Sequence, residues 1–460
     1  MISKILSAFK TILSPLPLGG VGGGFRHAFA LIREDKLFSA IYVAGTAVAI
    51  ASAMVVALIL HIRISNIYPE EHRDRTVYLK SYFKNDKGAF VGYSGYSPLA
   101  VEELFSHLKC AEVVSANMDN SYVYRFTACE ELGKQEMPVT MKFTDANFYR
   151  LYDFQFVSGR PYTDEQLQHA EKCIVITDVL ARRVFGTTEQ VAGRQLLLNY
   201  LPYRVVGVVR EVSPLLVNSS ADVYLPYTVN DSRSHWQSRD VSYAGGLEVT
   251  VLLKEGCTYQ MLKDELEPYR AKYLSMLRQA TGRDYEFSID AQMHWARTLN
   301  FEESYDMSTG DMLYNLQYPA LLMLLLLLLP AINLSGLVSN QMEARIAEMG
   351  IRKAFGAKRR TLLSEVIHEN LVLTLLGGIA GYALSWLFIS AMCSNTMFLT
   401  LFEREYDPIN SVSLQLDMFF TPTLFLIAFV CCAVLNLMAA LIPAWSSLRK
   451  PIVESLNQKR

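Results

Sequence analysis

The sequence lacks the short motifs that mark common energy-converting and hydrolytic sites. No GxxxxGK[ST] phosphate loop, HExxH zinc motif or CxxC pair occurs in the 460 residues. Tyr96 stands where a nucleophile elbow needs its second glycine, and the SxxK match at Ser106 has no partner motifs. No basic patch interleaved with aromatic residues indicates nucleic acid. We therefore predict a non-enzymatic chain that binds no cofactor or metal of its own.

Acidic and basic side chains are also missing from four long apolar runs, at residues 37–60, 318–338, 371–392 and 418–442. Each run exceeds the roughly 18 residues at which a membrane-spanning helix becomes the default interpretation. Because the runs hold no charge, a proton or ion relay through the bilayer has no support. Glycines at Gly377, Gly378 and Gly381 predict close packing of the third helix against its neighbours.

The segments that follow these runs differ in charge. Residues 339–360 carry six Arg or Lys against two Glu, and the tail after residue 443 is also basic, whereas residues 393–417 are acidic. Basic loops of membrane proteins stay on the cytoplasmic side. We therefore expect both termini in the cytoplasm and residues 62–317 and 393–417 outside it.

These observations give a complete layout for the chain. It consists of a cytoplasmic leader with an amphipathic helix (1–36), a first span (37–61), a large external domain (62–317), a second span (318–338), a cytoplasmic coupling segment with a lead-in helix (339–370), a third span (371–392), a short external loop (393–417), a fourth span (418–442) and a cytoplasmic tail (443–460). The fold class is a membrane protein with four transmembrane α-helices and a large α+β domain inserted between the first two.

The external insertion carries alternating and β-branched runs typical of strands. They lie at residues 76–80, 122–126, 139–143, 173–177, 203–209, 222–227 and 247–253. Helices are predicted at 98–108 with Ser97 as N-cap, at 178–185 stopped by Gly186, and at 259–280. Four cysteines fall in this domain, Cys110, Cys129, Cys173 and Cys257. Their number permits disulfides in an oxidising compartment, and free buried thiols are the alternative.

The lead-in to the third span holds Glu365, His368 and Glu369, whose side chains are of the types that bind metal ions. The spacing of these three residues does not supply a clear set of three ligands, so we favour an interfacial helix.

Residues 348–357 read EMGIRKAFGA and resemble the E-x-G-[IV]-R-K-A-x-G-A cytoplasmic motif of MacB/FtsX-type ABC transporter permeases. Further similarity lies in residues 333–335, in Glu369, in the ending IPAWSSLRKP at 442–451, and in the external stretches 143–160, 173–186 and 203–209. The chain departs from full MacB proteins in having a glycine-rich leader and no fused ATPase domain. That departure favours an ATPase on a separate subunit.

The resemblance implies that the segment after the second span docks in a groove of the ATPase. The implied coupling residues are Met342, Glu343, Arg345, Ile346, Glu348, Met349, Gly350, Ile351, Arg352, Lys353, Ala354, Phe355, Gly356 and Ala357. Met342, Ile346 and Met349 would form the apolar face, and Gly350 and Gly356 would end and redirect the helix. Arg352 and Lys353 would pair with acidic groups of the ATPase, or would only follow the charge rule for cytoplasmic loops.

The resemblance also implies partners and a location. It predicts a bacterial inner-membrane protein, a cytoplasmic ATPase that holds ATP and Mg²⁺, a second permease in a homo- or heterodimer, surrounding lipid, and room for a periplasmic adaptor. The implied function is export or efflux by mechanotransmission, in which ATP-driven motion reaches the external domains. Lipoprotein release by the same superfamily and a membrane sensor with an external ligand-binding domain are the alternatives.

Overall fold

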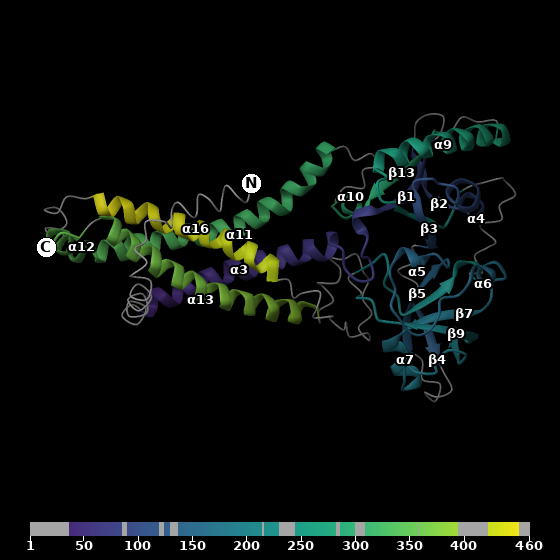
Figure 1. Cartoon of the computed structure of the whole chain (residues 1–460), viewed down its shortest axis with the longest axis horizontal. Coiled ribbons are helices and arrows are strands. Elements are labelled where there is room, and N and C mark those ends of the chain that lie inside the picture. Colours follow the sequence, from purple (N-terminus) through teal and green to yellow (C-terminus); the bar gives the residue numbers. More distant parts are fainter. Residues whose placement is uncertain are drawn as a thin grey trace. The chain divides into compact units, whose positions relative to one another are not determined.

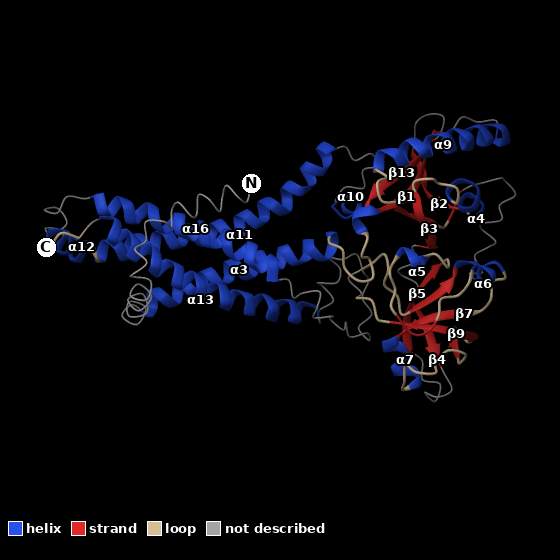
Figure 2. Cartoon of the chain, in the orientation of Figure 1, coloured by secondary structure: helices blue, strands red, loops and turns tan. Residues whose placement is uncertain are grey.

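The computed structural model describes residues 36–84, 90–118, 124–128, 137–213, 216–229, 244–281, 286–299, 309–357, 359–393 and 422–449. The chain divides into two compact units. The helical unit draws on residues 1–59, 317–391 and 419–460, and the sheet unit on residues 60–316 and 392–418. Figure 1 traces the chain through both units, and Figure 2 shows that one is built of helices and the other around a sheet.

The helical unit packs long helices around a small apolar core. Its helices are α3 (Lys36–Ile64), α11 (Thr309–Ala344), the short α12 (Ile346–Ala354), α13 (Arg359–Cys393) and α16 (Pro422–Arg449), of which α3 and α11 extend into the sheet unit. The core includes Tyr42 of α3, Val338 of α11, Leu373 of α13 and Ala440 of α16. The four long helices therefore contact one another through their side chains.

Among the described residues, three helices are long and apolar enough to cross a membrane, Lys36–Ile64, Thr361–Ala391 and Thr423–Ser446. They contain most of the predicted first, third and fourth spans. The predicted second span, residues 318–338, lies inside α11. That helix continues past the predicted end of the span at residue 338 and ends at Ala344.

Close packing of the third predicted span against its neighbours is confirmed. A Cβ atom on Gly377 would lie 2.7 Å from the side chain of Thr46, and one on Gly378 would lie 2.7 Å from the ring of Phe429. A Cβ on Gly381 would lie 2.8 Å from the carbonyl oxygen of Ala47. The glycines therefore let α13 approach α3 and α16 more closely than any side chain would allow.

The sheet unit contains thirteen strands within the described residues. They are β1 (Thr76–Lys84), β2 (Phe90–Tyr96), β3 (Ala111–Met118), β4 (Tyr124–Ala128), β5 (Met137–Thr144), β6 (Phe156–Gly159), β7 (Cys173–Thr177), β8 (Gln195–Leu198), β9 (Leu201–Val209), β10 (Val223–Pro226), β11 (Ala244–Gly245), β12 (Glu248–Leu253) and β13 (Glu286–Met293). Their order is β10-β7-β9-β8-β4-β5-β3-β12-β1-β2-β11, with β13 beside β1 and β6 beside β9.

This path has two separate apolar cores, which define two lobes. In the first lobe, side chains from β1 and β12 pack with α9 (Tyr259–Thr281), as Val77, Val251 and Leu266 show. In the second lobe, β5, β7, β9 and β10 pack with α7 (Asp178–Phe185) around residues such as Ile176 and Val205. The lobes meet where β3 pairs with both β12 and β5.

All seven strands predicted from the sequence are present, and two helices match closely. β7 has every residue buried, as its uninterrupted apolar run requires, and it pairs in parallel with β9. α7 begins where the Thr177 hydroxyl accepts a hydrogen bond from the Leu180 amide at 3.3 Å. It ends at Gly186, whose φ of 71° places it in the left-handed region.

Other parts of the sheet unit differ from the predictions. β2, β3, β6, β8, β11 and β13 were not predicted. The helix predicted at 98–108 is the short α4 (Pro98–Ala100) followed by a wider π-type turn in which the Ser106 amide donates to the Val101 carbonyl. Ser97 caps α4 as expected, accepting a hydrogen bond from the Ala100 amide at 3.2 Å. Within the described residues, Cys110, Cys173 and Cys257 are free thiols, and Cys129 lies outside those residues.

Candidate coupling segment

The segment between α11 and α13 makes a turn, a short helix and a second turn. α11 ends at Ala344 because Arg345 takes a non-helical conformation, with φ −96° and ψ 2°. The Arg345 amide still donates to the carbonyls of Gln341 and Met342, at 3.1 and 3.2 Å. α12 then runs from Ile346 to Ala354. The predicted coupling motif is therefore a separate helix and does not continue α11.

The end of α12 is a Schellman motif built on Gly356. Gly356 has a φ of 91°, its amide donates to the Lys353 carbonyl, and the Ala357 amide donates to the Arg352 carbonyl, both at 3.0 Å. This is the helix-ending role predicted for Gly356. The same role predicted for Gly350 is wrong, because Gly350 lies buried in the middle of α12.

A buried carboxylate ties the first turn to α13. Glu369 of α13 accepts hydrogen bonds from the Gln341 amide group at 3.0 Å and from the Arg345 guanidinium at 3.1 Å. The Glu369 side chain is only 6% exposed and that of Arg345 is 19% exposed. A charge pair that is so little hydrated holds its geometry tightly, because losing either partner would strand the other charge.

A second ion pair holds the body of α12. Arg352 donates to Glu365 of α13 at 2.9 Å, and both side chains are 38% exposed. Within this chain Arg352 pairs with α13, and its pairing with an acidic group of the ATPase stays a prediction. Lys353, predicted for the same role, is half-buried. Together the two ion pairs fix α12 against one face of α13.

The apolar residues of the segment lie differently from the predicted face. Met342 is 1% exposed and packs in the core of the helical unit, so its predicted place on a docking face is wrong in this structure. The side chains of Ile346, Glu348 and Met349 lie outside the described residues. Phe355 is 88% exposed and Ile351 is 49% exposed. Among the described side chains of the segment, these two are the exposed large apolar residues.

The remaining predicted residues fall around this pair. Glu343 and Ala354 are exposed and Ala357 is half-buried. Glu343 lies on the last turn of α11, whereas Ala354 and Ala357 flank Phe355 at the end of α12. The segment therefore offers an apolar surface at its C-terminal end.

Comparison with known families agrees with this arrangement of parts. Residues 39–269 match the family model of the MacB-like periplasmic core domain, and residues 320–452 match that of the FtsX-like permease C-terminal domain. The chain belongs to the MacB/FtsX-type family of ABC transporter permeases. The sheet unit thus holds the periplasmic core domain, and α12 lies inside the permease domain.

The permease has distant relatives of known name. It is 24% identical over 318 residues to the macrolide export ATP-binding/permease protein MacB of Escherichia coli, covering 68% of this chain and 42% of that protein. It is 23% identical over 347 residues to MacB 1 of Yersinia pestis, covering 75% and 46%. The chain thus spans less than half the length of these relatives. The solved periplasmic region of MacB from Actinobacillus actinomycetemcomitans aligns at 15% identity and a TM-score of 0.32, covering 47% of this chain and 88% of that one.

Sequence reasoning missed the partners on α13 that position α12 of the permease. Glu365 and Glu369 were considered as metal ligands, but each binds an arginine of the coupling segment. The His368 ring is hydrogen-bonded at 2.6 Å to the Ser364 carbonyl of its own helix. The signal was present, because Glu365 and Glu369 are four residues apart and so share one helix face.

A polar cluster inside the permease bundle also went unpredicted. The Asn436 amide of α16 donates to the hydroxyls of Thr46 on α3 and Thr374 on α13, at 3.3 and 3.4 Å, and Thr374 also bonds the Tyr42 hydroxyl at 3.2 Å. Interhelical hydrogen bonds of this kind contribute about 0.6 kcal/mol on average in membranes. They join three helices next to the core that Met342 enters.

Proposed function

We propose that this permease couples ATP hydrolysis by a separate cytoplasmic ABC ATPase to motion of its periplasmic domain, with α12 as the helix that docks on the ATPase. The observation that carries the proposal is the exposed pair Ile351 and Phe355 on a helix fixed by two ion pairs. ATP and Mg²⁺ would be bound by the ATPase and not by these 460 residues, which contain no phosphate loop.

Spacing and support distinguish this pair from an ordinary exposed apolar residue. Isolated apolar side chains on a surface need no explanation. Ile351 and Phe355 are four residues apart, so they start from one face of the helix, as in helices that bind in grooves. Because α12 is held by Arg345–Glu369 and Arg352–Glu365, little conformational entropy is lost when a partner binds this face.

The surrounding charge defines the partner further. Lys353 lies two residues before the exposed phenylalanine, and Lys358, Arg359 and Arg360 begin three residues after it. An apolar groove with an acidic rim would complement such a helix. The exposed aromatic end would enter the groove, and the basic residues would steer the approach.

Charge also supports the orientation that we propose. The coupling segment is basic and residues 393–417 are acidic, which favours a cytoplasmic α12 and places both termini in the cytoplasm. The periplasmic core domain then lies across the bacterial inner membrane from the ATPase. In a variant whose seven native cysteines are replaced by serine, cysteines introduced singly at positions 4 and 459 should react with a membrane-impermeant maleimide only after the cells are opened, and reaction in intact spheroplasts would overturn the orientation.

The proposal extends to efflux by mechanotransmission, carried out by a dimer of permeases. Motion started at α12 would reach the periplasmic domain through the helices, so cargo need not cross the bundle. The absence of charged residues from the predicted spans agrees with this route. Release of a lipoprotein from the outer leaflet would use the same coupling and is the alternative outcome for cargo.

The experiment compares two exposed aromatic residues. Tagged wild-type permease, Phe355→Ala and Tyr200→Ala are purified in mild detergent, and copurifying proteins are identified by mass spectrometry. Tyr200 is the matched control, since it is 74% exposed and lies in the sheet unit. We expect an ABC ATPase with wild type and with Tyr200→Ala. Loss of a hot-spot aromatic costs about 2 kcal/mol or more, so Phe355→Ala should weaken ATPase binding by about 30-fold.

The outcomes separate the competing functions. Equal ATPase recovery with Phe355→Ala would refute α12 as the docking helix. Wild-type permease that binds no ATPase at low salt would refute the proposed function and favour the sensor alternative.

A further inference from the structure

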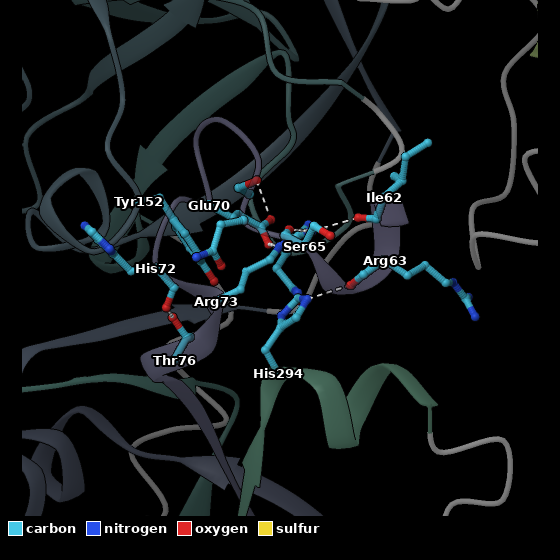
Figure 3. Close-up of polar contacts among 12 residues, drawn as sticks. Ile62, Arg63, Ser65, Glu70, His72, Arg73, Thr76, Tyr152 and His294 are labelled. Atoms are coloured by element: carbon cyan, nitrogen blue, oxygen red, sulfur yellow. Dashed lines mark hydrogen bonds and ion pairs between the residues drawn. The ribbon is translucent and has the colours of Figure 1, made fainter. Parts of the chain in front are cut away.

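The end of α3 is held by a buried group of polar residues in the sheet unit. We call this group the helix-end clasp and define it as Glu70, Arg73, Tyr78, Ser219 and His294. Figure 3 labels Glu70, Arg73 and His294 of the clasp beside Ile62, Arg63 and Ser65. All five belong to the sheet unit, as do the last residues of α3 from position 60 onward. The clasp plays no part in the coupling segment described above.

Arg73 is the centre of the clasp. Its guanidinium donates to the carbonyls of Ile62 and Ser65, both at 2.7 Å, and its Nε donates to Glu70 at 2.8 Å. The Arg73 side chain is 4% exposed and that of Glu70 is fully buried. The last carbonyls of a helix lack partners within the helix and attract positive charge. Arg73 meets both needs at the end of α3.

His294 completes the capping from a distant part of the chain. Its Nε2 donates to the Arg63 carbonyl at 2.8 Å, so the ring carries its proton there, and its Nδ1 accepts from the Tyr78 hydroxyl at 3.1 Å. Burial lowers the pKa of His294 to about 4, helped by Arg73 and Arg297 and opposed by Glu70. The histidine is therefore neutral in the folded protein at physiological pH.

The clasp draws on both lobes of the sheet unit. Tyr78 lies on β1 and His294 begins α10 (His294–Leu299), directly after β13, both in the first lobe. Ser219 lies just before β10 of the second lobe, and its hydroxyl donates to Glu70 at 2.6 Å. Asn218 beside it donates to the Tyr78 hydroxyl at 3.0 Å. One buried network thus joins the end of a predicted membrane span to both lobes.

We propose that the helix-end clasp is the positioning device that passes motion of α3 to both lobes of the periplasmic domain. The inference rests on the proposed function, because it assigns residues to the transmission step. A buried ion pair is weak evidence for added stability, since apolar residues of similar size often do as well. The hydrogen bonds of the clasp are directional, however. Arg73 and His294 together hold three carbonyls at the end of α3 and so resist rotation of the helix end.

The test uses the permease with its ATPase in lipid nanodiscs and has two readouts. The first is stimulation of ATPase activity by the permease, which reports docking. The second is the change in amide exchange of residues 60–75 and 216–229 between nucleotide-free and vanadate-trapped complexes, which reports transmission. The variants are Arg73→Met, Arg73→Lys as the conservative replacement, and Arg204→Met as a control, since Arg204 is a half-exposed partner of Glu171.

We expect Arg73→Met to keep the ATPase stimulation of wild type, because Arg73 lies in the sheet unit and not in the coupling segment, and to lose the nucleotide-dependent change in exchange. Arg73→Lys should restore part of that change, because lysine can pair with Glu70 but cannot reach both carbonyls at once. Arg204→Met should match wild type. If Arg73→Met does not fold, as judged by exchange in β7 and β9, His294→Phe takes its place under the same criteria.

The failures of the two proposals are distinguishable. A wild-type permease that does not stimulate the ATPase refutes the proposed function. Wild-type stimulation with an unchanged nucleotide response in Arg73→Met refutes the clasp alone, and so does the absence of any nucleotide response in wild type.

Discussion

Removal of the Glu369 carboxylate should release α12 from α13. In Glu369→Ala, the Arg345 guanidinium, which is 19% exposed, loses its counter-charge and Gln341 loses its acceptor. Breaking a fully buried pair costs about 3 to 5 kcal/mol. Because Arg345 keeps some contact with water, we expect Glu369→Ala to lower the free energy that holds α12 against α13 by about 2 to 3 kcal/mol. α12 would then open about 30 to 150 times more often.

Amide exchange of α12 measures this opening without requiring two-state unfolding of the whole protein. Arg345→Ala, Glu369→Ala and the double variant form a cycle, and we expect a coupling of at least about 1 kcal/mol within the pair. The half-exposed pair Arg204–Glu171 provides the control, with a coupling below about 1 kcal/mol. Unchanged exchange of α12 in Glu369→Ala, or strictly additive effects in the cycle, would show that the Arg345–Glu369 pair does not hold α12.

Three further predictions concern other contacts. Arg352→Glu should lower ATPase stimulation and Glu365→Arg should partly restore it, because the reversed pair keeps the contact; no restoration counts against that contact. Gly381→Ala places a Cβ 2.8 Å from a backbone oxygen of α3, so it should cost about 1 to 3 kcal/mol of stability and lower the thermal midpoint in detergent, whereas Gly336→Ala, with open space, should leave the midpoint unchanged. The folded pKa of His294, about 4, lies below the free value of 6.5, so stability is full above pH 6.5 and falls by about 3 kcal/mol as pH drops toward 4. Amide exchange at residues 60–65, corrected for intrinsic rates, should therefore become faster as pH falls from 7 to 5, and His294→Phe should abolish that pH dependence. An equal pH dependence in His294→Phe would show that His294 does not cause it.

The sequence predicted those elements whose local signals agree with their packing. α7 is correct at both ends because Thr177 caps its start and Gly186 takes the left-handed conformation at its end. β13 was missed although Phe287, Ile289 and Ala291 alternate with polar residues. It follows a long helix, and its pairing with β1 is a contact across about two hundred residues that local pattern cannot reveal.

The coupling segment was located correctly, but its exposed face was not. Counting Met342, Ile346 and Met349 as one face assumes a continuous helix, and the break at Arg345 resets the helical phase. Met342 therefore belongs to the core of the helical unit, and Phe355 becomes the exposed residue. The partners of the two arginines come from α13, beyond the turn at Gly356.

The helix-end clasp lay beyond sequence reasoning for a different reason. Glu70 and Arg73 are close in sequence, but Ser219 and His294 reach them only through the folded sheet. Buried polar residues look like surface residues in a composition pattern.

The central claim is that α12 binds the ATPase through Phe355, and photo-crosslinking tests it most directly. A benzophenone amino acid is placed at position 355, or at position 200 as the control, and complexes in native membranes are irradiated. We expect a crosslink to a nucleotide-binding subunit from position 355 and none from position 200. Crosslinks from position 355 only to lipid or to the permease itself would show that Phe355 does not bind the ATPase.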